Sequence, residues 1–268
     1  MTKPARTPQT GLLYPIWRCA ISPPDGSFGR NGRLGAIVPA NNSVLEPEWW
    51  SKLPPGVALY ATRILARGDL TPEAVRAMEA NVDRAVDELA ATGVDVIAYC
   101  DMVTTFIMEP GWNEVKVAEI EKRSHTPAIS AWTALRDALT ALGIKRFALG
   151  TPYPAAIHAL AAPFFTGRGY EVVSNRTLDI VKMTDVPKVT LRQIRDFVAA
   201  LDRKNAEAVL LLATDLPCFS VLAELEREFG IPVLTSNQTL LWSAMRTTAK
   251  SNKTASVSIP DIGKLFHV

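Results

Sequence analysis

A cysteine and a carboxylate stand side by side at the point where an apolar stretch of the sequence ends. The stretch reads Gly93-Val94-Asp95-Val96-Ile97-Ala98-Tyr99-Cys100-Asp101-Met102-Val103-Thr104-Thr105. Its apolar part is typical of a buried β-strand, and open α/β sheets bind their ligands beyond the carboxyl ends of such strands. We therefore expect chemistry at Cys100 or Asp101, with the hydroxyl of Thr104 close by.

The second half of the chain contains a variant of the same stretch. It reads Asn205-Ala206-Glu207-Ala208-Val209-Leu210-Leu211-Leu212-Ala213-Thr214-Asp215, again an apolar run that breaks into polar residues. An ungapped alignment of the two stretches pairs Asp101 with Thr214 and Cys100 with Ala213. If the two copies meet at the carboxyl ends of their strands, Asp101 and Thr214 face each other across a cleft suited to a small ligand.

Strands and helices alternate through the sequence around these two stretches. In the first half the pattern predicts strands at 33–38, 57–64, 93–99 and 127–130, and helices at 72–92 and 131–142. Thr71-Pro72-Glu73 marks the start of the first helix, with Thr71 as its N-cap. In the second half it predicts strands at 146–150, 170–174, 209–212 and 231–234, and helices at 155–165, 191–201, 219–229 and 238–246. Such alternation implies parallel sheets with helices on both faces.

The repeat extends to residue types. Segments 126–135 and 231–241 both place a proline before a short strand, hydroxyl residues after it, and then an apolar helix with a tryptophan. We predict an α/β fold of two pseudo-symmetric lobes, 33–143 and 144–248, each a parallel four-stranded sheet flanked by helices, with the active-site cleft between them. A proline-rich N-terminal arm (1–32) and a loosely held polar tail (249–268) flank the lobes.

Composition narrows the function classes. The 268 residues carry a net charge of +2, and the basic residues are scattered, so we expect no nucleic-acid partner. No apolar run reaches the ~20 residues of a membrane span, and the polar N-terminus resembles no signal peptide. Three cysteines without metal-ligand spacing indicate free thiols and a cytoplasmic protein. With only three histidines, neither a histidine-rich metal site nor a serine-type triad is predicted.

Four fragments point to a known family by their order and spacing. They are Ile37-Val38-Pro39-Ala40-Asn41-Asn42-Ser43, Gly93-Val94-Asp95-Val96, Thr151-Pro152-Tyr153 and Gly230-Ile231-Pro232-Val233. Together they resemble the aspartate/glutamate racemase superfamily, and more closely its maleate isomerase and arylmalonate decarboxylase branch, over about residues 33–247. The resemblance implies a small carboxylate substrate and no metal or organic cofactor. We also expect a homo-oligomer.

The family uses two cysteines, one at the end of the third strand of each lobe, as acid and base or as a nucleophile. Its decarboxylase-like members keep only the second. Transferred to this sequence, the first position falls on Asp101, with Cys100 one residue early. The second falls on Thr214, with Cys218 four residues late.

The resemblance also implies a set of substrate-binding residues. Asn42 and Tyr153 match an Asn and a Tyr that bind a substrate carboxylate in relatives. We add Thr151 and Thr104 as further binding candidates. A second substrate-binding Asn of the family is replaced by Met183.

The chemistry of these residue types suggests roles for them. A carboxyl with an ordinary pKa of ~3.9 becomes a useful base if burial raises that pKa, so we assign proton transfer to Asp101. The Thr214 hydroxyl would hold a carboxylate or oxyanion. Cys218 follows Pro217 at a predicted helix start, where the helix dipole would lower its pKa. Cys100 would be a core thiol on the opposite face of its strand.

Structural roles stay open beside the functional ones. Asp101 and Asn42 could simply cap the segments that follow them, and the threonines could be ordinary loop hydroxyls. We expect His158 to be a structural histidine.

Three functions compete. The leading hypothesis is proton transfer at the carbon next to a carboxylate, of the isomerase or decarboxylase type, with Asp101 moving the proton. The second is hydrolysis of a small amide, imide or ester by water that Asp101 activates. The third is a catalytically degenerate protein that binds a small acid without converting it.

Overall fold

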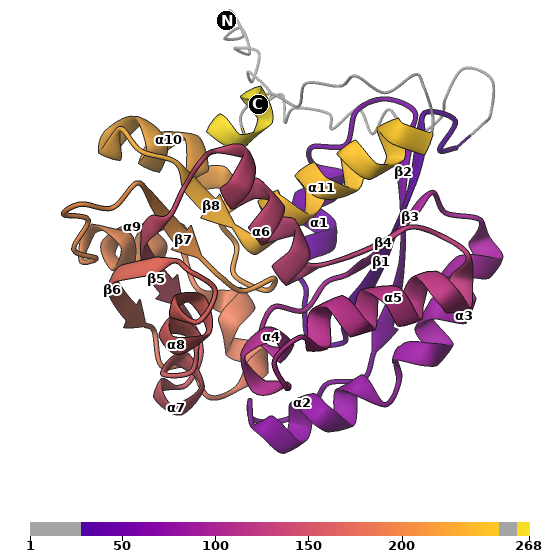
Figure 1. Ribbon diagram of the computed structural model, residues 1–268, viewed down its shortest axis with the longest axis horizontal. Coiled ribbons are helices and arrows are strands. Elements are labelled where there is room, and N and C mark those ends of the chain that lie inside the picture. Colours follow the sequence, from indigo (N-terminus) through magenta and orange to yellow (C-terminus); the bar gives the residue numbers. More distant parts are fainter. Residues whose placement is uncertain (1–27, 252–261) are drawn as a thin grey trace, which may run out of the picture.

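Two parallel four-stranded sheets form the body of the protein (Figure 1). The computed structural model describes residues 28–251 and 262–268, so most of the predicted arm 1–32, including Cys19, lies outside the described residues. The first sheet has the order β2-β1-β3-β4 and the second the order β6-β5-β7-β8. The strands are β1 (Gly32–Pro39), β2 (Val57–Ile64), β3 (Val96–Tyr99), β4 (Ala128–Ser130), β5 (Arg146–Thr151), β6 (Glu171–Thr177), β7 (Ala208–Leu211) and β8 (Val233–Thr235).

The predicted α/β fold class is confirmed: both sheets are parallel and helices flank them. The first-half helices are α1 (Leu45–Trp50), α2 (Pro72–Glu79), α3 (Val82–Thr92), α4 (Thr104–Ile107), α5 (Trp112–Ser124) and α6 (Ala131–Ala141). The others are α7 (Ala155–His158), α8 (Ala161–Thr166), η1 (Met183–Lys188), α9 (Leu191–Ala199), α10 (Phe219–Phe229), α11 (Ser236–Ser251) and η2 (Lys264–His267). None of the helices in the described ranges has the length and apolarity that a bilayer span requires.

Two predicted helices are broken in the structure. Thr71 caps α2 as expected, since its hydroxyl accepts from the backbone N–H of Ala74 at 3.2 Å. The helix stops at Asn81, whose side-chain amide binds the carbonyl oxygens of Ala77 and Met78, and α3 begins anew. Residues 155–165 likewise divide into α7 and α8, close to a proline that cannot donate a helical hydrogen bond. Helices α1, α4, α5 and η1 were not predicted.

Equivalent hydrogen bonds confirm that the two sheets are copies of one pattern. The N–H of Ile97 in β3 bonds to the carbonyl of Pro127, and the N–H of Val209 in β7 bonds to that of Pro232, both at 2.9 Å. Each proline precedes the fourth strand of its sheet. Ile97 and Val209 are therefore equivalent positions.

This register corrects the ungapped alignment by one residue. Counting on from Ile97 and Val209, Asp101 is equivalent to Ala213, and Thr214 lies one position further along. The third strands match, but the loops that follow them differ: a short helix, α4, begins at Thr104, whereas α10 begins only at Phe219.

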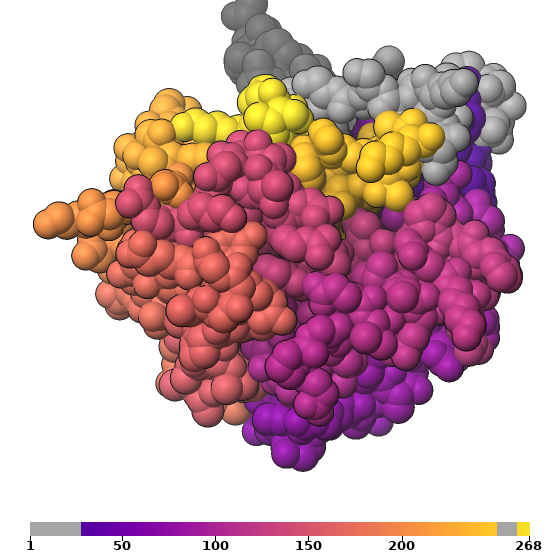
Figure 2. All heavy atoms as spheres, in the orientation of Figure 1, coloured from indigo at the N-terminus to yellow at the C-terminus, as the bar shows by residue number. Residues whose placement is uncertain are grey.

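The two halves share a single hydrophobic core. Helix α11, which follows the last strand of the second sheet, packs against α6 and against β1 and β3 of the first sheet. In the space-filling view, residues of the second half (orange) directly adjoin those of the first half (magenta and indigo) (Figure 2). The lobe limits at 143 and 248 stay a prediction.

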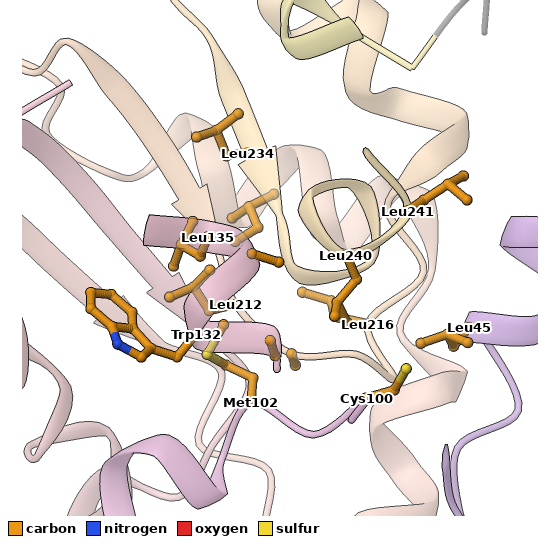
Figure 3. Packing of buried hydrophobic residues seen from close by; sticks show 14 of the residues in the cluster. Leu45, Cys100, Met102, Trp132, Leu135, Leu212, Leu216, Leu234, Leu240 and Leu241 are labelled. Carbon is orange, nitrogen blue, oxygen red and sulfur yellow. The ribbon is translucent and has the colours of Figure 1, made fainter. Parts of the chain in front are cut away.

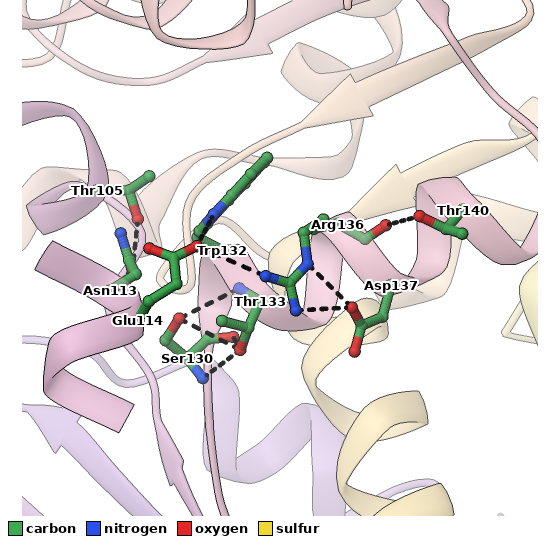
Figure 4. A network of polar contacts seen from close by, with 9 residues as sticks. All are labelled: Thr105, Asn113, Glu114, Ser130, Trp132, Thr133, Arg136, Asp137 and Thr140. Atoms are coloured by element: carbon green, nitrogen blue, oxygen red, sulfur yellow. Dashed lines mark hydrogen bonds and ion pairs between the residues drawn. The ribbon is translucent and has the colours of Figure 1, made fainter. Parts of the chain in front are cut away.

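A polar network fixes the chain around α4 and α5. The Thr105 hydroxyl and the Asn113 side chain lie 3.4 Å apart, which ties α4 to α5 (Figure 4). The Trp132 indole donates to Glu114 at 3.1 Å, which ties α5 to α6. At the start of α6, Ser130 forms a capping box with its own helix. Helix α4, which follows Asp101, is thus tied to α5, and α5 in turn is tied to α6.

The end of the predicted loose tail is in fact docked. Ile262 and Leu265 are fully buried, and the backbone N–H of Lys264 donates to the Glu226 carboxylate at 2.7 Å. Ile262 and Leu265 therefore anchor residues 262–268 on the second half. The sequence predicted a loose tail because the residues before 262 are polar, although Ile262 and Leu265 are apolar and dock the segment.

Leu265→Ala should lower the free energy of unfolding by about 2 to 4 kcal/mol, because it removes a fully buried side chain and leaves a cavity. Urea denaturation followed by circular dichroism measures this. Val268→Ala, at an exposed position of the same segment, is the control and should cost little. A Leu265→Ala protein as stable as wild type would show that this segment does not stay docked.

Candidate active site

A pocket lies where the two halves meet at the carboxyl ends of their strands. The space between its lining atoms is about 490 Å³, open solvent at its mouth included. Its polar lining consists of Asn41, Asn42, Asp101, Tyr153, Thr214 and Asp215. Its apolar lining consists of Pro39, Ala66, Leu70, Val75, Met78, Met102, Val103, Ile180, Met183 and Val186. Both halves contribute to each set, so the predicted cleft between the lobes exists.

Backbone pairing between the halves closes the apolar side of this pocket. The N–H of Leu70 donates to the carbonyl of Val181 at 2.8 Å, and Asp69 forms an isolated antiparallel bridge with Lys182. Leu70 comes just before α2 and Val181 just before η1. The apolar wall is therefore one continuous surface built from both halves.

Asp101 follows β3 and is held with one oxygen fixed. Its Oδ1 accepts from the backbone N–H of Thr104 at 2.8 Å. The residue is only 7% exposed. Burial raises the pKa of Asp101 to about 6, against the lowering effect of the hydrogen bonds from Thr104 and Val103. The capping role left open by the sequence is present, and the same carboxyl also lines the pocket.

Asp215 is a second carboxyl in this pocket, and sequence reasoning missed it. Its Oδ2 accepts from the Asn41 side-chain amide at 3.3 Å. Burial, and then the negative charge of Asp101, raise the pKa of Asp215 to about 7. The signal was present, because Asp215 directly follows Thr214, but the ungapped alignment drew attention to the threonine.

Thr214 and Asn42 line the pocket, but their side chains form hydrogen bonds with other groups of the protein. The Thr214 hydroxyl donates to the carbonyl of Cys100 at 3.0 Å and accepts from Asn42 Nδ2 at 3.1 Å. Asn42 Oδ1 accepts from the N–H groups of Val44 and Leu45 at the start of α1. The Thr214 proton is committed to a carbonyl in this arrangement, which does not favour the expected oxyanion-holding role. Asn42 is a cap, with one amide hydrogen left over.

Tyr153 reaches the pocket as expected. Its ring packs edge-on against Phe106, with centroids 6.3 Å apart, and its hydroxyl makes no hydrogen bond to any residue in the described ranges. Burial, and then the charges of Asp101 and Asp215, raise the pKa of Tyr153 well above its usual range. The phenol thus stays protonated and is available as a donor.

Thr151 and Thr104 do not line the pocket. Thr151 is fully buried, and its hydroxyl lies 2.9 Å from His158 Nδ1, so both are structural, as expected for His158. Thr104 is also fully buried, and its backbone N–H holds Asp101. The substrate-binding assignment of both threonines is corrected: Thr104 positions the carboxyl rather than the substrate.

Neither described cysteine reaches the pocket. Cys100 is fully buried in the hydrophobic core, among leucines that include Leu45 and Leu216 (Figure 3). Burial raises its pKa well above the usual range, so the expected core thiol is confirmed. Cys218 is equally buried, and the catalytic role predicted for it is not supported.

The environment of Cys218 raises its pKa, whereas the sequence predicted a lowered pKa. Burial, and then the carboxylate of Glu48, raise the pKa of Cys218 well above the usual range. Glu48 Oε1 accepts from the backbone N–H groups of Cys218 and Phe219 at 2.7 and 2.8 Å, and its Oε2 from Asn237 at 2.8 Å. The start of α10 thus binds the Glu48 carboxyl of α1, whose pKa burial raises to about 7. Local sequence could not reveal a partner so distant in the chain.

No cluster of His, Cys, Asp and Glu side chains suited to a metal ion occurs among the described residues. What the pocket brings together is two carboxyls of raised pKa, a protonated phenol and an apolar wall.

Comparison with known proteins identifies the family. The model of the arylmalonate decarboxylase family matches residues 34–260. The chain belongs to the arylmalonate decarboxylase family. The predicted resemblance to the maleate isomerase and arylmalonate decarboxylase branch of the aspartate/glutamate racemase superfamily is therefore confirmed.

Two curated relatives cover most of the chain. The maleate isomerase of Geobacillus stearothermophilus is 26% identical over 233 residues, which are 82% of this chain and 93% of that protein. The arylmalonate decarboxylase of Bordetella bronchiseptica is 27% identical over 238 residues, which are 87% and 95%. Both are enzymes, and this chain is an enzyme of the same family.

Solved structures agree with the fold. The maleate cis-trans isomerase of Nocardia farcinica, as a cysteine-to-serine variant with a covalently bound succinylcysteine intermediate, superimposes with a TM-score of 0.81. Sequence identity is 26%, and 88% of this chain and 98% of that chain are covered. In that relative a cysteine sulfur bonds to the reacting molecule, whereas the described cysteines of this chain lie outside the pocket.

Asp101→Asn should stabilise the fold at pH 8 more than at pH 4. The pKa of Asp101 rises from its ordinary 3.8 to about 6 in the folded protein, so the unfolded chain ionises this carboxyl more readily. The stability it contributes is fully present below its unfolded pKa and is lost as the pH rises through about 6. At 1.36 kcal/mol per pKa unit, the neutral amide should remove a penalty of about 2 to 3 kcal/mol at pH 8.

Urea denaturation of both proteins at the two pH values measures this difference. Asp196→Asn, at a side chain that is 73% exposed, is the control and should show no comparable pH dependence. The same gain for Asp101→Asn at pH 4 and at pH 8 would contradict the raised pKa.

Proposed function

We propose that the protein is a cofactor-independent enzyme that moves a proton at the carbon next to a carboxylate of a small carboxylic acid, of the isomerase or decarboxylase type. The observation that carries this proposal is Asp101. It is a buried carboxyl of raised pKa that lines the pocket and is oriented by the Thr104 N–H. A base with a pKa near the working pH is best suited to proton transfer. That the enzyme is a homo-oligomer stays a prediction.

In the first step, Asp101 acts as the base. Its carboxylate takes the proton from the substrate carbon, and the electron pair of that C–H bond moves into the neighbouring carboxylate to form an enediolate. The bond from the Thr104 N–H to Oδ1 keeps the carboxyl oriented. In a decarboxylation, loss of carbon dioxide produces the same enediolate, and a protonated Asp101 then delivers the proton to carbon.

Tyr153 stabilises the enediolate, and Asp215 protonates it. The protonated Tyr153 phenol donates a hydrogen bond to the oxygen on which negative charge develops. Asp215, with a pKa of about 7, still holds its proton when Asp101 has lost its own, and can therefore supply the acid. Two interacting carboxyls whose pKa values are pushed apart divide the roles of base and acid.

The positions of the cysteines favour proton transfer over addition of a thiol to the substrate. Cys100 and Cys218 are both buried away from the pocket, and burial raises the pKa of each, which keeps the thiols protonated and unreactive. A thiol adduct like the one in the Nocardia relative would need a sulfur at the place of Asp101.

Asp101→Asn should reduce turnover by at least about 10³-fold, because the amide cannot accept the proton. Turnover is followed by proton NMR in D₂O, as deuterium incorporation at carbon, over a panel with maleate, an arylmalonate and 2-substituted saturated acids. Cys100→Ala and Cys218→Ala are the controls and should keep most of the activity.

Two results would contradict this assignment. Retained turnover in Asp101→Asn with a folded protein would exclude Asp101 as the base. Incorporation of oxygen-18 from labelled water into a product carboxylate would instead support hydrolysis of an amide, imide or ester.

The pH profile of kcat/KM should be bell-shaped. Activity should fall below pH about 6, where Asp101 becomes protonated, and above pH about 7, where Asp215 loses its proton. Asp215→Asn should lower the maximum and remove the alkaline limb while it keeps the acid limb. An alkaline limb unchanged in Asp215→Asn would show that another group supplies the acid.

A further inference from the structure

A single loop of the second half, residues 212–218, carries Asp215 to the pocket. The loop connects β7 to α10, and loops are ordinarily more mobile than the elements that they connect. An acid transfers its proton efficiently only if it is held in place beside the substrate. Two residues outside the loop, Glu48 and Asn237, hold it.

Glu48 of α1 fixes the end of this loop. Its Oε1 accepts from the backbone N–H groups of Cys218 and Phe219 at 2.7 and 2.8 Å. Both N–H groups lie at the start of α10, where the helix itself offers them no acceptor. Cys218 and Phe219 are buried, so loss of the carboxyl would leave two donors without a partner.

Asn237 of α11 extends this hold to the middle of the loop. Its Nδ2 donates to Glu48 Oε2 at 2.8 Å and to the carbonyl of Thr214 at 2.9 Å. Its own backbone carbonyl accepts from the indole N–H of Trp49, the residue after Glu48, at 3.0 Å. Thr214 directly precedes Asp215. Asp215 therefore lies between two points that Glu48 holds, one directly and one through Asn237.

Helix α1 is itself anchored at the pocket. Asn42 Oδ1 accepts from two backbone N–H groups at the start of α1, and the preceding Asn41 donates to Asp215 Oδ2 at 3.3 Å. The first half thus contacts Asp215 directly through Asn41 and supports its loop through Glu48.

We propose that Glu48 is a positioning residue for Asp215: from α1 it holds the 212–218 loop at two points and so keeps the Asp215 carboxyl in its place in the pocket. This inference rests on the proposed function for the role of Asp215 as the acid. It adds to the machinery a residue that lies outside the pocket lining. A residue that only stabilises the fold would not alter the environment of this one carboxyl.

The pKa of Asp215 reports its position. Burial, and then the charge of Asp101, raise it to about 7, against the hydrogen bonds from its own backbone and from Asn41. The Tyr153 phenol, which faces the same charges, stays protonated. A loosened loop admits water and lets the carboxyl move away from Asp101, so its pKa should fall toward the ordinary 3.8.

The pKa is measured without substrate, by carbon-13 NMR titration of the full chain labelled at its aspartate carboxyls. Asp215→Asn assigns the signal. Asn237→Ala is the decisive variant, because it removes the link to the Thr214 carbonyl without changing any charge. It should lower the pKa of Asp215 by at least about one unit.

Glu48→Gln should lower the pKa of Asp215 as well, because one amide oxygen cannot serve all three donors. It also removes a charge. Glu48→Asp keeps the charge but is too short to reach all three donors, so it should give the same downward shift and replaces Asn237→Ala if that protein does not fold. The shifts of Glu48→Asp and Asn237→Ala should not add in the double variant, because both act through one set of bonds.

Glu226→Gln is the matched control. Glu226 is likewise a buried carboxyl of raised pKa that accepts from two backbone N–H groups, those of Val233 and Lys264, but it lies outside the pocket lining. Its replacement should lower stability to urea and leave the pKa of Asp215 unchanged. An unchanged pKa of Asp215 in folded Asn237→Ala or Glu48→Asp, or an equal shift in Glu226→Gln, would overturn the proposal.

Turnover provides a second readout. In Asn237→Ala, kcat should fall at least about tenfold with KM changed less than about threefold, because Asp215 acts after the substrate is bound. The NMR titration needs no reaction, so an absent shift refutes the role of Glu48 whatever the enzyme catalyses. Retained turnover in Asp101→Asn would refute the proposed function and leave the measured shift of Asp215 standing.

Discussion

The two halves of the protein are joined at the pocket by a chain of buried hydrogen bonds through Thr214. Asn42 Nδ2 donates to the Thr214 hydroxyl, which donates to the carbonyl of Cys100, so that the carboxyl ends of β1, β3 and β7 are tied together. Each bond contributes only about 1 kcal/mol to the free energy of unfolding. The loss of any one of them would leave a buried polar group without a hydrogen-bond partner, which destabilises the protein by more than that. The halves therefore cannot separate by rigid movement without breaking the floor of the pocket, and the distance between Asp101 and Asp215 is fixed by the same bonds.

This junction also explains why the carboxyls are reactive. It brings them together in a region closed by the apolar wall, where water is too scarce to solvate two charges. Burial is the largest cause of the raised pKa of both Asp101 and Asp215. The hydrogen bonds from Thr104 and Asn41 limit this effect without removing it. The fold thus gives up stability at neutral pH to keep two carboxyls near their working range, a trade-off common at active sites.

The sequence predicts the fold well because buried strands and amphipathic helices leave a local signal. All eight strands and the cap of Thr71 follow from such signals. The site is harder, because its residues lie in loops whose lengths differ between the halves. Asp101 can be predicted because it ends a strand in the first copy. Asp215 lies two residues beyond the position equivalent to Asp101, in a loop that is longer than its counterpart, so the repeat does not point to it. Burial, and then Glu48, which lies far away in the sequence, raise the pKa of Cys218, and both effects arise only from packing.

A carboxyl base, as proposed for Asp101, differs from a thiol in more than its strength as a base. A thiolate is a strong nucleophile and can bond to carbon, as the succinylcysteine of the Nocardia relative shows. A carboxylate in the same region is a weaker nucleophile, which leaves proton transfer as its natural role. Its charge depends on the pH, because burial raises the pKa of Asp101 to about 6 and that of Asp215 to about 7. The two carboxyls therefore change their protonation state in the pH range where the proposed proton transfer would work, and the same burial that makes them suitable as base and acid also sets that range.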